Sequence, residues 1–253
     1  NKLGWKVHSF DHEDANGQFE FDFAYADVMT MADRFVVWRL MMKEIARKHG
    51  WEATMMAKPY ADRTGSGAHF NMSLADVKTG ENISGDAADP RGCGLSKLAY
   101  QFLGGLKKHA AAIVAVSCPT VNSYKRFGPD SLAPWLIDWG LDNRSAMVRI
   151  PPDRGSGARL ELRLGDASAN PYLVVAAALA AILLGIRAGQ EPPLPLEGYG
   201  YNPSNADLLP MDLTSALDAL QADAKLTDLL GKEFVSSYLT YKRNEVERFQ
   251  RHV

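Results

Sequence analysis

The segment 159–163 constrains the fold of this 253-residue chain more than any other. Its sequence, Arg-Leu-Glu-Leu-Arg, has the two-residue period of a β-strand, so Arg159, Glu161 and Arg163 share one face. Apolar runs at 146–148 and 173–184 flank it, which predicts a deeply placed strand. Because buried charges need partners, we expect the charged face to line a cavity for ions and charged ligands. The alternative is a solvated edge strand with an Arg-Glu-Arg ladder.

Charge and cysteine content exclude several classes of function. The 28 Lys and Arg residues nearly balance 30 Asp and Glu residues, and no basic run is present, which argues against nucleic acid or a membrane as a partner. Cys93 and Cys118 form no disulfide framework and no thiolate metal motif, as expected in a reducing cytoplasm. The apolar run 172–186 is short for a bilayer and predicts a buried helix.

An acidic turn and an aromatic strand follow the N-terminus. From Phe19 to Tyr25 aromatic residues fill every second position, and we expect this face to enter the core. Glu20 then points from the other face, where the preceding turn can bring Glu13 beside it. Two such carboxylates suit a hard divalent cation. The alternative is a half-exposed strand with a solvated acidic face.

A glycine-rich loop, Gly65-Ser66-Gly67, precedes a second alternating segment. His69, Asn71 and Ser73 share a face there, while the glycines allow a ligand to approach the backbone. The loop lacks the lysine of a Walker motif. A neutral imidazole that joined the carboxylates of Glu13, Glu20 and Glu161 would form a mixed nitrogen and oxygen site suited to Mg²⁺ or Mn²⁺. The alternative is a histidine that only makes structural hydrogen bonds.

The other segments predict an α+β fold: a curved, mainly antiparallel sheet with helices over the face opposite the charges. We expect a strand at 51–57, strand-like alternation over 136–150, and helices from Asp27 or Thr30 to Lys48, at 95–115, 212–220 and 232–252. The irregular segment 118–135 is long enough to be functional. Arginines clustered near an acidic metal site favour a substrate with phosphate and carboxylate groups.

Seven ordered blocks resemble the catalytic domain of the glutamine synthetase family, over nearly the whole chain. They are His12-Glu13 with Gly17–Glu20, Lys58-Pro59, Gly65–His69, Asn122–Arg126, Asn143-Arg144, Arg159–Arg163 and Ser168–Tyr172. The resemblance implies half of a catalytic barrel built between subunits of stacked six-membered rings, and hence a homo-oligomer. It also implies an ATP-dependent ligase that uses Mg²⁺ or Mn²⁺ to join the γ-carboxylate of L-glutamate to an amine through γ-glutamyl phosphate.

The resemblance also implies roles for individual residues. Divalent cations would be held by Glu13 with Glu20 and by His69 with Glu161. Glutamate would be bound by Gly65, Arg126, Arg144 and Arg163, of which Arg144 and Arg163 also act in catalysis. ATP would be bound by Asn71, Ser73, Arg144, Arg149 and Arg159.

The chain departs from the family pattern at three positions. Thr64 stands where the family usually has Asn, and Asn71 stands where the family often has His. Leu132 stands where ammonia-using members carry a Glu that binds ammonium and takes its proton. An apolar side chain suits the carbon of an alkylamine instead, so we expect a small amine such as methylamine and a resemblance to the γ-glutamylmethylamide synthetase branch. Ordinary glutamine synthetase and a non-catalytic relative are the alternatives.

The whole chain, 1–253, resembles a catalytic domain. The small N-terminal domain of the family, with its acidic strand, has no counterpart in these residues. The chain begins without Met at Asn1-Lys2-Leu3, and we expect an N-terminal part to precede it.

Overall fold

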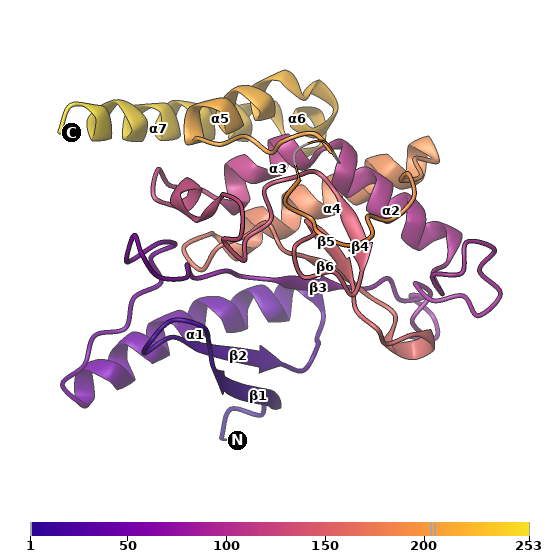
Figure 1. Cartoon of the computed structure of the whole chain (residues 1–253), viewed down its shortest axis with the longest axis horizontal. Coiled ribbons are helices and arrows are strands. Elements are labelled where there is room, and N and C mark those ends of the chain that lie inside the picture. Colours follow the sequence, from indigo (N-terminus) through magenta and orange to yellow (C-terminus); the bar gives the residue numbers. More distant parts are fainter. Residues whose placement is uncertain (1, 203, 205, 253) are drawn as a thin grey trace.

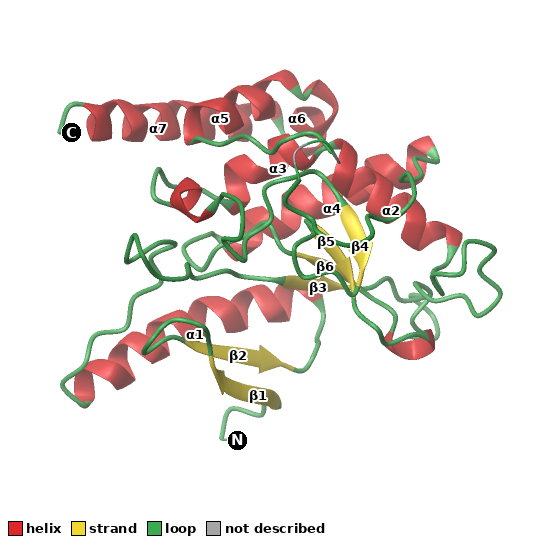
Figure 2. Cartoon of the chain, in the orientation of Figure 1, coloured by secondary structure: helices red, strands yellow, loops and turns green. Residues whose placement is uncertain are grey.

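The computed structural model describes residues 2–202, 204 and 206–252 and shows a mixture of helices and small open sheets (Figure 2). The strands are β1 (Val7–His12), β2 (Phe19–Phe23), β3 (Phe70–Met72), β4 (Trp139–Leu141), β5 (Val148–Ile150) and β6 (Leu160–Leu162). The helices are α1 (Val28–Lys48), α2 (Lys97–Lys108), α3 (Ala110–Ser117), α4 (Pro171–Ala188), α5 (Leu213–Ala222), α6 (Ala224–Leu230) and α7 (Lys232–Gln250). Short 3-10 helices occupy Ser123–Arg126 and Gly155–Gly157.

A four-stranded sheet in the order β3-β6-β5-β4 lies at the centre of the fold. Strands β3 and β5 pair antiparallel with β6, and β4 pairs parallel with β5. Leu160 and Leu162 are fully buried in the core that α2, α3 and α4 share with the sheet, while Glu161 projects from the other face. The predicted alternation and the predicted α+β class are therefore confirmed.

Helix α4 is the central helix of the layer behind the sheet. The side chain of Asn170 caps its first turn, and Gly189, with φ of +60°, ends it. It contacts α1, α2, α3 and α6. The helix has 18 residues, three more than the apolar run 172–186. By length and composition alone it could cross a membrane, so the expectation that this segment is too short for a bilayer was wrong. Its packing among four helices makes it a core helix.

The β1–β2 hairpin and α1 lie on the opposite side of the four-stranded sheet from α2, α3 and α4 (Figure 1). Asp27 caps α1 as predicted, by accepting a hydrogen bond from the backbone N–H of Thr30. The prediction for the aromatic face was only partly right. Phe21 packs edge-on against Trp38 of α1, but Phe19 is 48% exposed and its ring contacts are to Phe10 and His12 of β1.

Two other predicted elements were wrong. Residues 51–57 form no strand, because no neighbouring strand pairs with them; the carbonyl of Ala57 instead accepts a hydrogen bond from Ser66 at 2.8 Å. The predicted helix 95–115 is broken into α2 and α3 at His109, whose ring hydrogen-bonds to Asp223. Asp223 caps α6, a helix the sequence pattern did not predict. The break at His109 thus coincides with a contact between residues 114 positions apart in the chain.

Lys107 of α2 reaches toward the four-stranded sheet. Its side chain is half-buried and donates a hydrogen bond to the carbonyl of Ile137, just before β4. Helices α5 and α7 lie where amphipathic patterns predicted them, and Asp212 caps α5 through the backbone N–H of Ser215. Together α5, α6 and α7 cover α3 on the side away from the sheet (Figure 1).

Candidate active site

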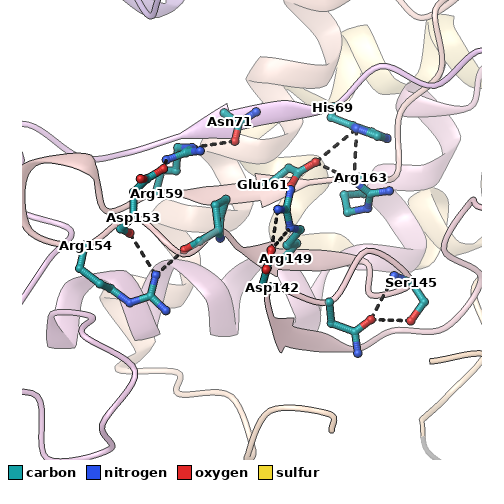
Figure 3. Close-up of polar contacts among 12 residues, drawn as sticks. His69, Asn71, Asp142, Ser145, Arg149, Asp153, Arg154, Arg159, Glu161 and Arg163 are labelled. Atoms are coloured by element: carbon teal, nitrogen blue, oxygen red, sulfur yellow. Dashed lines mark hydrogen bonds and ion pairs between the residues drawn. The ribbon is translucent and has the colours of Figure 1, made fainter. Parts of the chain in front are cut away.

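The centre of the candidate site is a row of three residues across the four-stranded sheet. Asn71 of β3 pairs in register with Glu161 of β6, and Glu161 pairs with Arg149 of β5. Directly paired residues project from the same face of a sheet. The row therefore lies on the charged face, and Figure 3 shows the side chains that join it from neighbouring segments.

Glu161 has partners on both carboxylate oxygens. Oε1 accepts a hydrogen bond from Nη1 of Arg163 at 2.7 Å and lies 3.2 Å from Nδ1 of His69. Oε2 accepts a hydrogen bond from Nη1 of Arg149 at 2.8 Å. Burial alone would raise the pKa of Glu161, but the bond to His69 and the charges around it lower the pKa to about 2. Glu161 is therefore a carboxylate at neutral pH.

His69 lies immediately before β3 and faces Glu161. Loss of solvation lowers the pKa of its imidazole, and the positive charges of Arg163 and Arg126 lower it further, against the opposing effect of Glu161. This environment favours the neutral ring, which is the form that ligates a metal ion.

The glycine loop brings the backbone against Arg126. A methyl group on Gly65 would lie 2.7 Å from Cγ of Arg126 and 2.7 Å from the carbonyl oxygen of Ala57, so only glycine fits at this position. Arg126 is 4% exposed, and its buried Nη1 has no hydrogen-bond partner among the described residues. A buried guanidinium with an unpaired N–H group is suited to bind an anionic ligand.

The acidic turn is attached to the same loop. Nε2 of Gln18 donates a hydrogen bond to the carbonyl of Gly65 at 3.0 Å, and the hydroxyl of Thr64 donates one to Asp14. These contacts hold the turn that contains Glu13 next to the glycine loop.

Glu20 on β2 is electrostatically coupled to the sheet. Its pKa is raised, first by partial burial and then by the nearby carboxylates of Asp22, Glu13 and Glu161, while Arg144 lowers it. The charges of the hairpin and of the sheet therefore influence one another at Glu20.

The four predicted cation ligands fit a divalent cation in their chemistry. They are Glu13, Glu20, His69 and Glu161. Their oxygen and nitrogen donors suit Mg²⁺ or Mn²⁺, and the carboxylate repulsion at Glu20 is the kind that a cation relieves. Within the described residues, however, no group of three or more donors lies close enough together to hold an ion. Only His69 and Glu161 are in contact.

Arg159 occupies the far end of the charged face. Its Nε donates a hydrogen bond to Oδ1 of Asn71 at 3.1 Å, and its Nη1 donates one to Oδ2 of Asp153 at 2.7 Å. Ser73 is exposed just beyond the end of β3. The predicted nucleotide-binding residues Asn71, Arg149 and Arg159 thus line one face together with Glu161.

Arg144 lies in the turn between β4 and β5 and is exposed. No described contact joins it directly to Arg163, its predicted catalytic partner, although its charge reaches Glu20. The neighbouring Asn143 donates a hydrogen bond to the carbonyl of Gly198 at 2.9 Å, which holds this turn against the segment after α4.

Leu132 lies in the segment after Arg126 and is 54% exposed. Its φ of +60° is in the left-handed region, which a bulky residue rarely adopts. Tyr201 connects Leu132 to the site. Burial raises the pKa of Tyr201, whereas the nearby charge of Arg163 and a hydrogen bond with the backbone of Leu132 lower it.

Three residues of the site escaped sequence reasoning: Asp142, Asp153 and Tyr201. Asp142 binds Arg149, with its Oδ1 at 3.0 Å from Nε and 2.6 Å from Nη2. Asp153 binds Arg159 through one hydrogen bond, from Nη1 of the arginine to its Oδ2 at 2.7 Å. Each aspartate lies within seven residues of its arginine, and that proximity was the available signal. No sequence signal pointed to Tyr201.

The fold and the charged face define an α+β domain of the kind that binds anionic ligands on one side of a sheet. The family comparison is more specific: the family model "Glutamine synthetase, catalytic domain" matches residues 1–253. The chain belongs to the glutamine synthetase family.

Relatives within the family carry two kinds of name. Glutamine synthetase of Rhizobium meliloti (strain 1021) is 42% identical over 254 residues, which are 96% of this chain and 57% of the relative. Glutamate–methylamine ligase of Methyloversatilis universalis is 40% identical over 264 residues, which are 99% of this chain and 58% of the relative. The chain therefore spans less than two thirds of the length of these relatives.

Two solved structures of GmaS, γ-glutamylmethylamide synthetase, share the fold. The structure described as "GmaS/ADP complex-Conformation 1" is 41% identical with a TM-score of 0.91 and covers 100% of this chain and 59% of that one. "Apo GmaS without ligand" is 43% identical with a TM-score of 0.91, and the coverage is 100% and 58%. These likenesses confirm the resemblance to the methylamide-synthetase branch predicted from the motifs.

Proposed function

We propose that the protein is an ATP-dependent ligase that joins the γ-carboxylate of L-glutamate to a small alkylamine, preferably methylamine. The observation that carries this proposal is the network around Glu161, in which a buried carboxylate, an imidazole and two arginines meet on one sheet face. Membership in the glutamine synthetase family supports it, and so do relatives named glutamate–methylamine ligase and GmaS.

The arginines divide into two groups by position. Arg126, buried and with an unpaired N–H group, and Arg163, next to Glu161, are proposed to bind glutamate beside Gly65. Arg149 and Arg159 lie along the sheet with Asn71 and are proposed, with Ser73 and Arg144, to bind the phosphates and ribose of ATP. Planar guanidinium groups bind carboxylate and phosphate oxygens in pairs, which fits both ligands.

The reaction proceeds in two steps. A γ-carboxylate oxygen of glutamate attacks the γ-phosphorus of ATP, the bond to the bridging oxygen breaks and ADP leaves. The amine nitrogen then attacks the γ-carbonyl carbon, loses a proton and displaces phosphate. Arg144 and Arg163 neutralise the negative charge that moves during the first step, and phosphoryl transfer depends mostly on such positioning. Mg²⁺ or Mn²⁺ held by Glu13, Glu20, His69 and Glu161 would add Lewis-acid stabilisation of the phosphoryl oxygens.

The preference for an alkylamine is inferred from Leu132. Leucine can neither bind ammonium by charge nor accept its proton, whereas its methyl groups can contact the carbon of methylamine. The backbone of Leu132 hydrogen-bonds to Tyr201, and the charge of Arg163 lowers the pKa of that tyrosine, which supports a place for Leu132 at the edge of the glutamate site.

Ordinary glutamine synthetase is the second candidate. The identity to enzymes named glutamine synthetase, 42%, is as high as that to the methylamine ligase, so overall similarity does not separate the two substrates. An acid from another segment would then have to take the place of Leu132.

Phosphate release tests the choice of amine. With ATP, Mg²⁺ and glutamate, we expect kcat/KM for methylamine to exceed that for ammonia at least about tenfold, which corresponds to about 1.4 kcal/mol in the transition state. The substitution Leu132→Glu should reverse the order, whereas the matched apolar substitution Leu132→Met should preserve it. If the unsubstituted protein prefers ammonia and Leu132→Glu changes nothing, ordinary glutamine synthetase is the correct function.

We further propose a cytoplasmic homo-oligomer of stacked hexameric rings. Apolar side chains on α1 and just after it remain uncovered in the single chain, including Leu40, which is 64% exposed, and Trp51, which is 71% exposed. A monomeric mass in sedimentation velocity would contradict this assembly.

A further inference from the structure

Both oxygens of Glu161 are occupied by guanidinium groups, although Glu161 is a proposed cation ligand. Arg163 binds Oε1 at 2.7 Å and Arg149 binds Oε2 at 2.8 Å, and the Glu161 side chain is 6% exposed. A divalent cation therefore competes with an arginine for this carboxylate. Each oxygen keeps a second lone pair, but an ion at Glu161 would lie next to a guanidinium charge, so its binding is favoured when one of the two arginines moves away.

Arg149 is the arginine that can leave Glu161 more easily. A second carboxylate, that of Asp142, already binds Arg149 and would still bind it after it left Glu161. Arg163 is 8% exposed, and its guanidinium also lies 3.3 Å from Nδ1 of His69, so it is enclosed on the inner side of the site. Arg149 is more exposed, and its outer edge binds Oδ1 of Asp142 through Nε at 3.0 Å and Nη2 at 2.6 Å. Arg149 thus lies between two anions, one buried and one exposed (Figure 3).

Asp142 is held at this place by the backbone. It follows β4 directly, and its N–H donates a hydrogen bond to the carbonyl of Ile150 at the end of β5 at 2.9 Å. Its φ is +45°, a left-handed conformation that Asp and Asn tolerate better than most residues but that is still uncommon. Strain of this kind persists where surrounding structure enforces it, often at functional sites.

We propose that Asp142 is a positioning residue that draws Arg149 away from Glu161, so that a divalent cation can reach Oε2 while Arg149 stays bound at the edge of the site. This inference rests on the proposed function for the role of Glu161 as a cation ligand. It assigns Asp142 a role in cation affinity that acts only through Arg149.

Binding of Mn²⁺ alone, followed by electron paramagnetic resonance on the intact protein without nucleotide, tests the inference. Asp142→Asn keeps a residue that tolerates the left-handed backbone and removes only the charge. It should weaken Mn²⁺ binding about five- to tenfold, because Arg149 then neutralises Glu161 alone. Arg149→Gln should tighten Mn²⁺ binding, because it frees Oε2.

The double variant separates this mechanism from simple attraction between Asp142 and the ion. If Asp142 acts through Arg149, then Asp142→Asn has no effect in the Arg149→Gln background. If Asp142→Asn weakens Mn²⁺ binding equally in both backgrounds, direct attraction explains the effect and the inference is overturned.

Asp218→Asn is the matched control. Asp218 is 60% exposed, against 59% for Asp142, and it likewise binds an arginine at 2.7 Å, but on α5 and far from the site. It should leave Mn²⁺ affinity unchanged.

Equal affinities for the unsubstituted protein and Asp142→Asn would refute the role of Asp142 and leave the proposed function intact. Failure of the unsubstituted protein to bind Mn²⁺ would overturn both.

Discussion

Asp138 is a buried carboxylate next to the strands that carry the site, and its negative charge lowers the stability of the fold at neutral pH. It lies just before β4 and is 4% exposed. Its Oδ1 accepts a hydrogen bond from the backbone N–H of Met147 at 2.7 Å, which joins it to the residues leading into β5. Its Oδ2 has no partner in the described part of the chain. Burial raises the pKa of Asp138 to about 6, against the opposing effects of Met147 and Lys107.

The magnitude follows from the pKa difference. The shift from 3.8 to about 6 is worth about 3 kcal/mol, since one pKa unit corresponds to about 1.4 kcal/mol. The folded state retains the proton to higher pH than the unfolded state does, so the stability of the protein falls as the pH rises through this interval. The cost is below about 1 kcal/mol at pH 4 and reaches nearly its full value at pH 8.

Asp138→Asn should remove this cost, because the amide oxygen can still accept the hydrogen bond from Met147 and no charge is buried. Urea unfolding at intervals between pH 4 and pH 8 measures the difference in stability between the variant and the unsubstituted protein. We expect the variant to be nearly equal at pH 4 and more stable by about 1–3 kcal/mol at pH 8, with the lower value allowing for lost attraction to Lys107. The exposed substitution Asp218→Asn should show no such trend. A pH-independent difference, or a variant that is less stable at pH 8, would refute the reasoning.

Two glycine substitutions test close approaches of the backbone. Gly65→Ala should displace Arg126 and raise KM for glutamate about tenfold, with a smaller effect on kcat. Phosphate release at saturating ATP and methylamine measures both constants. An unchanged KM would show that Arg126 does not bind glutamate. Gly185→Ala should lower the free energy of unfolding by about 1–3 kcal/mol, because a methyl group there would lie 2.3 Å from the carbonyl oxygen of Gln101 where α4 crosses α2. A urea midpoint at or above that of the unsubstituted protein would contradict this close crossing.

Local patterns predicted the elements whose determinants lie within a few residues. The alternation at 159–163 correctly placed Glu161 on the face opposite Leu160 and Leu162, because the period of a strand fixes which residues share a face. The cap at Asp27 was predictable because its determinants are also local: its partner, Thr30, is three residues away.

Contacts between distant residues decided the rest. The break between α2 and α3 depends on Asp223, which is 114 residues from His109 and therefore invisible in the pattern of 95–115. The absence of a strand at 51–57 depends on the lack of a neighbour to pair with. Asp142 and Arg149 are only seven residues apart, but their pairing occurs at a left-handed backbone position, which no residue type signals by itself except glycine.

The charges of the site explain which arginine most needs a ligand. Arg149, Arg159 and Arg163 each have a carboxylate partner within the chain, so a substrate anion only exchanges with an existing partner and gains little net attraction. Arg126 and Arg144 have no ion-pair partner among the described residues, and of these two only Arg126 is buried. A buried, unpaired guanidinium is costly, and an incoming carboxylate removes that cost without breaking an ion pair. If the proposed function is correct, the free energy of glutamate binding should therefore come chiefly from Arg126, while Arg163 orients the glutamate and Arg149 and Arg159 orient the phosphates.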